Sequence, residues 1–149
     1  MTDKPINATL LKFGHPATLV RDYRHWCVLV RPAQATLGAL VLGAKGEARA
    51  FSALPAEAFT ELSIVTCHIE AGLGAFRHYD RINYLMLMMV DPHVHFHVLP
   101  RYEAGQEWNS MAFPDSGWPG PPILANAISP DPEKLARLVS EIAAHWPKD

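Results

Sequence analysis

The chain has 149 residues, the length of one domain, and 49% of them are hydrophobic, which is enough apolar material for a core. A formal net charge of −2 argues against a nucleic-acid-binding scaffold, and the absence of an apolar run of about 18 residues argues against a membrane span. Two cysteines, Cys27 and Cys67, and an amino terminus unlike a signal peptide predict a reduced, cytoplasmic protein.

The first part of the chain predicts strands. Residues 1–16 indicate a short helix or an irregular lead-in. Apolar and β-branched residues dominate 17–20 and 26–31, which predicts a β-hairpin that Pro32 closes. A further apolar run at 36–42 precedes a Gly-rich turn and predicts a third strand.

The middle of the chain predicts a long helix and then a strand. Apolar residues recur every three or four positions over 55–76, and Pro55 suits the first turn of a helix there. The almost wholly apolar run 82–90 predicts a central strand covered on both faces. Asp91-Pro92 then predicts a tight turn, so this strand should pair antiparallel with the one that follows.

The last third of the chain predicts a flap and a helix. Residues 102–122 are rich in Gly, Pro and Trp without periodicity, and we expect them to form a flap over the functional site. A helix should begin at Asp131 and run to about His145, packing on the sheet or on a partner subunit. We expect a single α+β domain over 1–149, with a core at about 17–101 and a C-terminal flap and helix at 102–149.

Three histidines alternate with apolar residues just past the middle of the chain. In an extended strand His93, His95 and His97 share one face, while Val94 and Phe96 share the other. Burying three imidazoles without partners is unfavourable, so the alternation indicates a polar ligand lying along the strand.

A metal site is the rival explanation for these histidines. His93 and His97 lie about 13 Å apart along a strand, too far for all three to close around one tetrahedral ion. No Cys-x-x-Cys or His-Glu-x-x-His stands in the sequence to complete a ligand shell. We therefore assign no metal ligand and no cofactor, and a His-ligated metal protein stays the less favoured alternative.

The run 93–99, followed by Pro100-Arg101, resembles the motif of the histidine triad family of nucleotide hydrolases and transferases. The resemblance implies that His95 attacks the α-phosphate and forms a covalent nucleotidyl-histidine, which water then hydrolyses. It also implies that His93 positions the centre and that His97 donates to the phosphoryl oxygens.

The resemblance carries further expectations. Asn83 and Arg101 are implied as nucleotide-binding residues, although a local hydrogen bond for Asn83 and a surface role for Arg101 are the structural alternatives. The substrate is a dinucleoside polyphosphate or a nucleoside phosphoramidate, and the Pro-Arg ending is more typical of the polyphosphate hydrolases. The family fold is an antiparallel sheet with one long helix and a C-terminal helix, and its homodimer joins two sheets across a two-fold axis.

The sequence departs from the family pattern at two places. Relatives carry a Gly-rich loop with Gln or Ser before the triad, where this chain has only Val90-Asp91-Pro92. Relatives also carry a histidine five residues before an early proline, where Cys27 precedes Pro32 here and His25 is the nearest substitute. These departures keep open a second interpretation, a nucleotide-binding module without catalysis.

Overall fold

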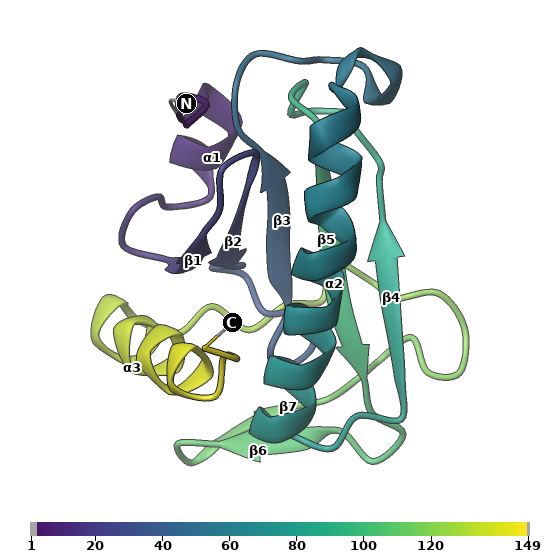
Figure 1. Ribbon diagram of the computed structural model, residues 1–149. Helices are drawn as coiled ribbons and strands as arrows, with labels where there is room; N and C mark the ends of the chain where they lie inside the picture. The colour runs from purple at the N-terminus through teal and green to yellow at the C-terminus, as the bar shows by residue number, and fades with distance from the viewer. Residues whose placement is uncertain (1–2, 149) are drawn as a thin grey trace.

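The computed structural model describes residues 3–148, which fold around a five-stranded antiparallel sheet (Figure 1). In chain order the strands are β1 (Leu19–Asp22), β2 (Trp26–Val30), β3 (Leu40–Ala44), β4 (Arg81–Leu85) and β5 (His95–Arg101). Their order across the sheet is β1-β2-β3-β5-β4, so β5 lies between two partners and β4 is an edge strand. The expected α+β class with an antiparallel sheet is confirmed.

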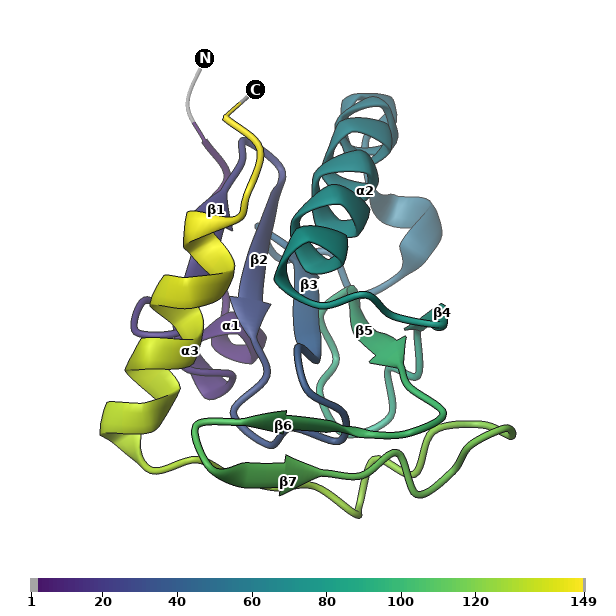
Figure 2. The same ribbon diagram turned by 90° about the horizontal axis from the view of Figure 1, so that it is seen from below.

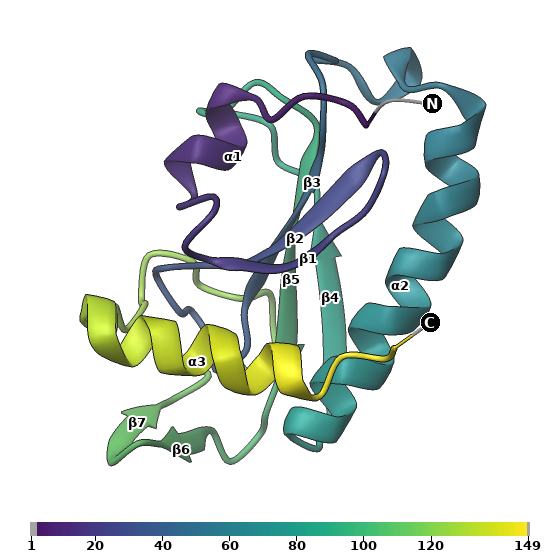
Figure 3. The same ribbon diagram turned by 60° about the vertical axis from the view of Figure 1, so that its left-hand side comes forward.

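Helices cover both faces of the sheet. The long helix α2 (Ala56–Phe76) runs along one face and the short helix α1 (Ala8–Lys12) lies on the other (Figure 3). Helix α3 (Pro132–Ala144) contacts β1 and α2, and a 3-10 turn, η1 (Phe51–Ala53), precedes α2. Asn7 and Asp131 begin α1 and α3, each accepting a hydrogen bond from a backbone N–H three residues on.

Two apolar clusters hold these layers together. The larger cluster lies between the sheet and the helices α2 and α3, and its most buried members include Trp26, Val28, Leu42, Val65, Ile69, Leu73, Val98, Leu138 and Ile142. The smaller cluster joins Leu10 of α1 to Cys27, Leu29 and Val41 on the opposite face. Because α1 is short, it covers only part of that face and leaves room for a site on β5.

Most of the predicted elements are confirmed. The hairpin is β1 with β2, the long helix is α2, and the C-terminal helix is α3 with Asp131 as its cap. The third strand begins at Leu40 instead of residue 36, because Gln34 holds the preceding segment in a turn. Its side chain donates to the carbonyl of Ala39 (2.9 Å) and accepts from the N–H of Gly38 (2.8 Å).

The prediction for the apolar run before the triad is wrong in two respects. Strand β4 ends at Leu85 and pairs only with β5, so it is neither a central strand nor one that reaches residue 90. Residues 86–94 form an irregular connection in place of a tight turn, and Met89 and Val90 are 84% and 83% exposed. The antiparallel pairing of β4 with β5 is confirmed. Apolar composition alone cannot distinguish a paired strand from an exposed loop.

The segment after β5 contains a hairpin that the sequence analysis does not predict. Strands β6 (Gln106–Trp108) and β7 (Met111–Phe113) pair antiparallel, and Asn109 and Ser110 turn between them with positive φ. The hairpin lies across the end of the five-stranded sheet that is farther from α1 (Figures 1 and 2). Within residues 3–148, no helix is both long and apolar enough to cross a membrane.

Candidate active site

His95 is the first residue of β5 and is almost fully buried, with 2% of its surface exposed. Its Nδ1 lies 2.7 Å from the backbone carbonyl oxygen of His93. Because a carbonyl oxygen only accepts, Nδ1 carries the hydrogen, and in the neutral ring Nε2 keeps its lone pair. Nε2 of His95 forms no hydrogen bond within residues 3–148. The fold therefore presents a single imidazole nitrogen in nucleophilic form.

His93 precedes β5, so the prediction that it lies in the same strand as His95 and His97 is wrong. Two contacts hold its ring. Its Nε2 lies 3.1 Å from Oε1 of Glu47, and its Nδ1 lies 2.8 Å from the hydroxyl of Thr9 on α1. A carboxylate only accepts, so in the neutral ring Nε2–H donates to Glu47 and Nδ1 accepts from Thr9. These two contacts fix His93, and its carbonyl in turn fixes the ring of His95.

His97 lies in β5, two residues after His95. Its ring is 5.1 Å from that of His95, and Phe13, the residue directly after α1, packs against both rings at 5.7 and 5.8 Å. Burial, together with the nearby Arg31 cation and His95, lowers the pKa of His97 to about 4. His97 is therefore neutral at pH 7, when it has one N–H to donate and no charge.

His95 and His97 open onto a pocket of about 340 Å³, a volume in the range of small-ligand sites. Its other walls come from α1, from Arg31 at the end of β2, and from residues 87–91. Lys12 pairs with Asp91 at 2.6 Å and so ties α1 to that connection. The Nε of Arg31 is buried without a hydrogen-bond partner among the described residues. The pocket thus combines a nucleophilic nitrogen with two cations, of which Lys12 is paired with Asp91 and Arg31 forms no ion pair among the described residues.

Gly43 allows α1 to cover the sheet beside His95. Gly43 pairs with His95 across β3 and β5, and a Cβ at this position would overlap Cδ2 of Leu10. Cys27, next in the same row of the sheet, is buried against Leu10. Burial raises the pKa of the Cys27 thiol to about 12, so the residue five positions before Pro32 is an inert core group. His25 lies in the turn between β1 and β2 and does not line the pocket of His95.

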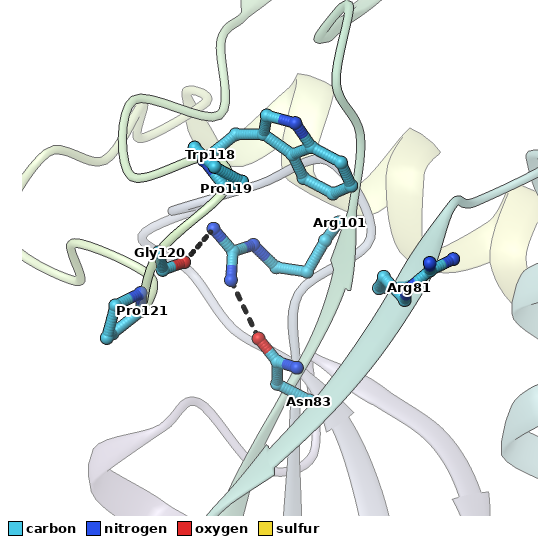
Figure 4. Close-up of a pocket in the computed structure, with 7 residues that line it drawn as sticks. All are labelled: Arg81, Asn83, Arg101, Trp118, Pro119, Gly120 and Pro121. Atoms are coloured by element: carbon cyan, nitrogen blue, oxygen red, sulfur yellow. Dashed lines mark hydrogen bonds between the residues drawn. The ribbon is translucent and has the colours of Figure 1, made fainter.

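Asn83 and Arg101 come together, but in a different pocket at the other end of β5 (Figure 4). Nη1 of Arg101 donates to Oδ1 of Asn83 (2.7 Å), and its Nε and Nη2 donate to the carboxylate of Asp115 (2.7 and 2.8 Å). Arg101 is 4% exposed and is not a surface residue. Residues 118–121 line that same pocket, so the predicted flap lies against Arg101 and not against His95. Nucleotide binding by Asn83 and Arg101 stays a prediction.

The fold brings to the triad several residues that are not predicted from the sequence. Arg31 had one usable signal, because a charged residue ends an apolar strand directly before Pro32. Lys12 and Phe13 line the pocket, and Thr9 and Glu47 hold His93, but all four lie more than 40 residues from the triad in sequence. No local pattern marks such residues, since the packing of α1 and the order of the strands bring them there.

The triad does not form a ligand shell. The ring of His93 contacts Thr9 and Glu47, and Nδ1 of His95 is bound to a backbone carbonyl. Within the described part of the chain, no three side chains of His, Cys, Asp or Glu gather closely enough to hold a metal ion. The donor set here therefore does not fit a tetrahedral zinc site.

Solved structures of histidine triad proteins share this fold. A histidine triad protein from Bradyrhizobium japonicum superposes with a TM-score of 0.67 at 15% sequence identity, covering 97% of this chain and 99% of that one. A hypothetical histidine triad nucleotide-binding protein from Sulfolobus tokodaii gives a TM-score of 0.60 at 16% identity, with coverages of 85% and 83%. A zinc-bound histidine triad family protein from Mycobacterium smegmatis gives 0.60 at 18% identity, with 91% and 89%.

Neither a scan of protein-family models nor a search of curated proteins finds a match to the sequence. The likeness is therefore one of fold: the chain has the histidine triad fold, which the motif at 93–99 predicts, and it shares few identical residues with the solved structures.

Proposed function

We propose that the protein is a nucleotide hydrolase or nucleotidyl transferase that acts at an α-phosphate through a covalent nucleotidyl-histidine at His95. The observation that carries the proposal is the 2.7 Å contact from Nδ1 of His95 to the carbonyl of His93, which leaves Nε2 as the nucleophile. The nucleotide-binding name of the Sulfolobus tokodaii protein supports a nucleotide as the ligand.

In the first step the lone pair of Nε2 attacks the α-phosphorus. An N–P bond forms while the bond from phosphorus to the leaving group breaks, and the leaving group departs with that electron pair and takes up a proton. In the second step a water oxygen attacks the same phosphorus. The N–P bond breaks, its electron pair returns to Nε2, the water loses a proton, and a nucleoside monophosphate is released.

The other groups in the pocket act on the charge of the phosphoryl group. His97, neutral at pH 7, donates its one N–H to a phosphoryl oxygen. Arg31 supplies positive charge for a polyphosphate or a phosphoramidate nucleotide, and the charge of Lys12 is partly offset by Asp91 in the same pocket. His93 acts through its carbonyl, so its role is to position His95.

The same proposal covers the leaving group and the assembly. Substrates are dinucleoside polyphosphates or nucleoside phosphoramidates, because both present an α-phosphorus next to a group that can depart. The irregular connection 86–94 is longer than the tight turn expected from sequence, so it provides backbone groups near the pocket where relatives carry a phosphate-binding loop.

We also infer a homodimer that joins two sheets across a two-fold axis.

The test is mass spectrometry of the protein mixed with diadenosine tetraphosphate or with an adenosine phosphoramidate. We expect a transient adenylyl adduct and nucleotide products with the natural chain, and neither with His95→Ala. His97→Ala should still form the adduct, with turnover lower by about 10²- to 10³-fold, because it removes one donor to the developing charge. His78→Ala, on an exposed histidine far from the pocket, is the matched control.

Two outcomes would decide against covalent catalysis. Turnover retained in His95→Ala would exclude His95 as the nucleophile. Nucleotide binding by the natural chain with no adduct and no product from either substrate would favour the alternative function, a nucleotide-binding module without catalysis.

A further inference from the structure

The pocket around Asn83 and Arg101 is larger than the pocket of His95 and lies away from the triad. It has a volume of about 520 Å³ and is lined by Arg81, Asn83, Arg101 and residues 118–121. Arg101 is six residues beyond His95 on β5, or about 20 Å along the strand. The two pockets therefore lie at opposite ends of β5, and the proposed chemistry at His95 makes no use of the second one.

The walls of this second pocket are held in place. Arg101 donates to both carboxylate oxygens of Asp115, to the carbonyl of Gly120 (3.0 Å) and to Oδ1 of Asn83. These bonds tie the segment 118–121 to β4 and β5, as Figure 4 shows for Gly120 and Asn83. A ligand would enter a pocket that is already formed, so binding would not have to order its walls.

The polar side chains that line the pocket have free hydrogen-bond donors. Because Oδ1 of Asn83 accepts from Arg101, the amide NH₂ of Asn83 is left to donate, and it makes no hydrogen bond within residues 3–148. Arg101 has five N–H donors and uses four. Arg81 is exposed, and its one described side-chain bond runs from Nη1 to the carbonyl of Asp80. Among residues 3–148 no carboxylate lines the pocket, so its chemistry favours an anion.

An aromatic ring stands across from these donors. In Figure 4 the indole of Trp118 lies at the top and Asn83 at the bottom, with the side chain of Arg101 between them and Arg81 to the right. Trp118 is partly exposed, whereas Trp26, Trp108 and Trp146 are buried. A partly exposed indole offers a face on which a flat ring can stack.

We propose that this pocket is a second binding site, for a phosphorylated compound with a flat aromatic ring such as a nucleoside monophosphate. The phosphate binds to Arg81 and the amide of Asn83, and the ring stacks on Trp118. The site goes beyond the proposed chemistry at His95, and it stands or falls independently of that chemistry.

Trp118 is also the reporter for the test, because the other tryptophans are buried. We would titrate the full chain with adenosine monophosphate and follow tryptophan fluorescence. A saturable change is expected with the natural chain and is expected to be lost in Trp118→Phe. Arg81→Ala should weaken binding by about tenfold or more, the loss typical of a charge-assisted hydrogen bond. Adenosine alone and inorganic phosphate alone should bind more weakly than the monophosphate.

Matched variants separate this site from the pocket of His95 and from unfolding. Asn83→Asp keeps an acceptor for Arg101 and replaces the free amide donors by negative charge, so it should weaken binding while the thermal midpoint is retained. Arg49→Ala, on an exposed arginine in neither pocket, and Arg31→Ala, in the pocket of His95, should leave the Trp118 response unchanged. The proposal is overturned if the natural chain gives no saturable response, or if Arg31→Ala abolishes the response while Arg81→Ala preserves it.

Discussion

The two histidines that face the candidate active-site pocket differ in what surrounds them. His95 donates through Nδ1 to a backbone carbonyl, which determines its tautomer. Nδ1 of His97 is buried with no hydrogen-bond partner among the described residues, and a positively charged arginine lies nearby. The Nδ1 contact fixes the ring of His95, while the ring of His97 is kept neutral by burial and by positive charge.

The low pKa of His97 predicts a pH dependence of stability. The pKa of His97 in the folded chain, about 4, is below the ordinary value of about 6.5. Between these two pH values His97 is therefore protonated in the unfolded chain and neutral in the folded chain. The natural chain should therefore lose stability as pH falls from about 6.5 to about 4, relative to His97→Gln. The relative loss is at most about 3.5 kcal/mol, since one pKa unit corresponds to about 1.4 kcal/mol.

Urea denaturation of both proteins at a series of pH values measures this difference. His78→Gln, which removes an exposed histidine instead, is the matched control. A difference between the natural chain and His97→Gln that stays constant from pH 7 to pH 4 would contradict a neutral, buried imidazole at position 97.

Among the elements, α1 depends on a glycine in the strand beneath it. Gly43→Ala should destabilise the protein by about 1–3 kcal/mol, because the new methyl group overlaps Leu10 and α1 must shift. Since Thr9 on α1 and Phe13 directly after it contact the triad, the variant should also form less adenylyl adduct. Gly74→Ala, where a Cβ would meet only Tyr79 at 3.9 Å, is the control and should be neutral or stabilising. Equal stability of the two variants would contradict this packing.

A buried ion pair holds the segment after β7 against the sheet. The side chains of Arg101 and Asp115 are 4% and 2% exposed, so Asp115→Ala leaves an unpaired buried cation and should cost about 3–5 kcal/mol. Urea denaturation measures the loss, and faster proteolysis within 114–122 should accompany it. Glu133→Ala, which breaks the exposed pair with Arg137, should cost no more than about 1 kcal/mol. Similar losses in the two variants would argue against a clamp at Arg101.

For the whole molecule, the free edges of the sheet bear on the proposed homodimer. Each of β1 and β4 pairs with one neighbour, but β1 carries an irregularity in its pairing and contacts α3. Strand β4 is the regular free edge, and such an edge pairs readily with a second strand. Size-exclusion chromatography with light scattering should give about twice the chain mass of 16.5 kDa. A single-chain mass over the whole concentration range would contradict the dimer.

Local patterns in the sequence predict much of this protein. Helical spacing predicts α2 and α3 almost to the residue, and alternation in the triad run predicts β5 and the shared face of His95 and His97. These features are predictable because periodicity reports which face of an element is buried, and burial of a face is set by neighbouring residues in the chain.

Other features depend on residues that are distant in the chain. The apolar run 86–90 has the composition of a strand, yet it leaves the sheet at Leu85. Strand order and helix packing place Arg31 and Lys12 beside the triad. They also place Asp115 and Asn83 where Arg101 can donate to them. A sequence pattern describes each element separately, whereas the partner of a buried charge is selected only when the elements come together, because desolvation makes an unpaired charge unfavourable.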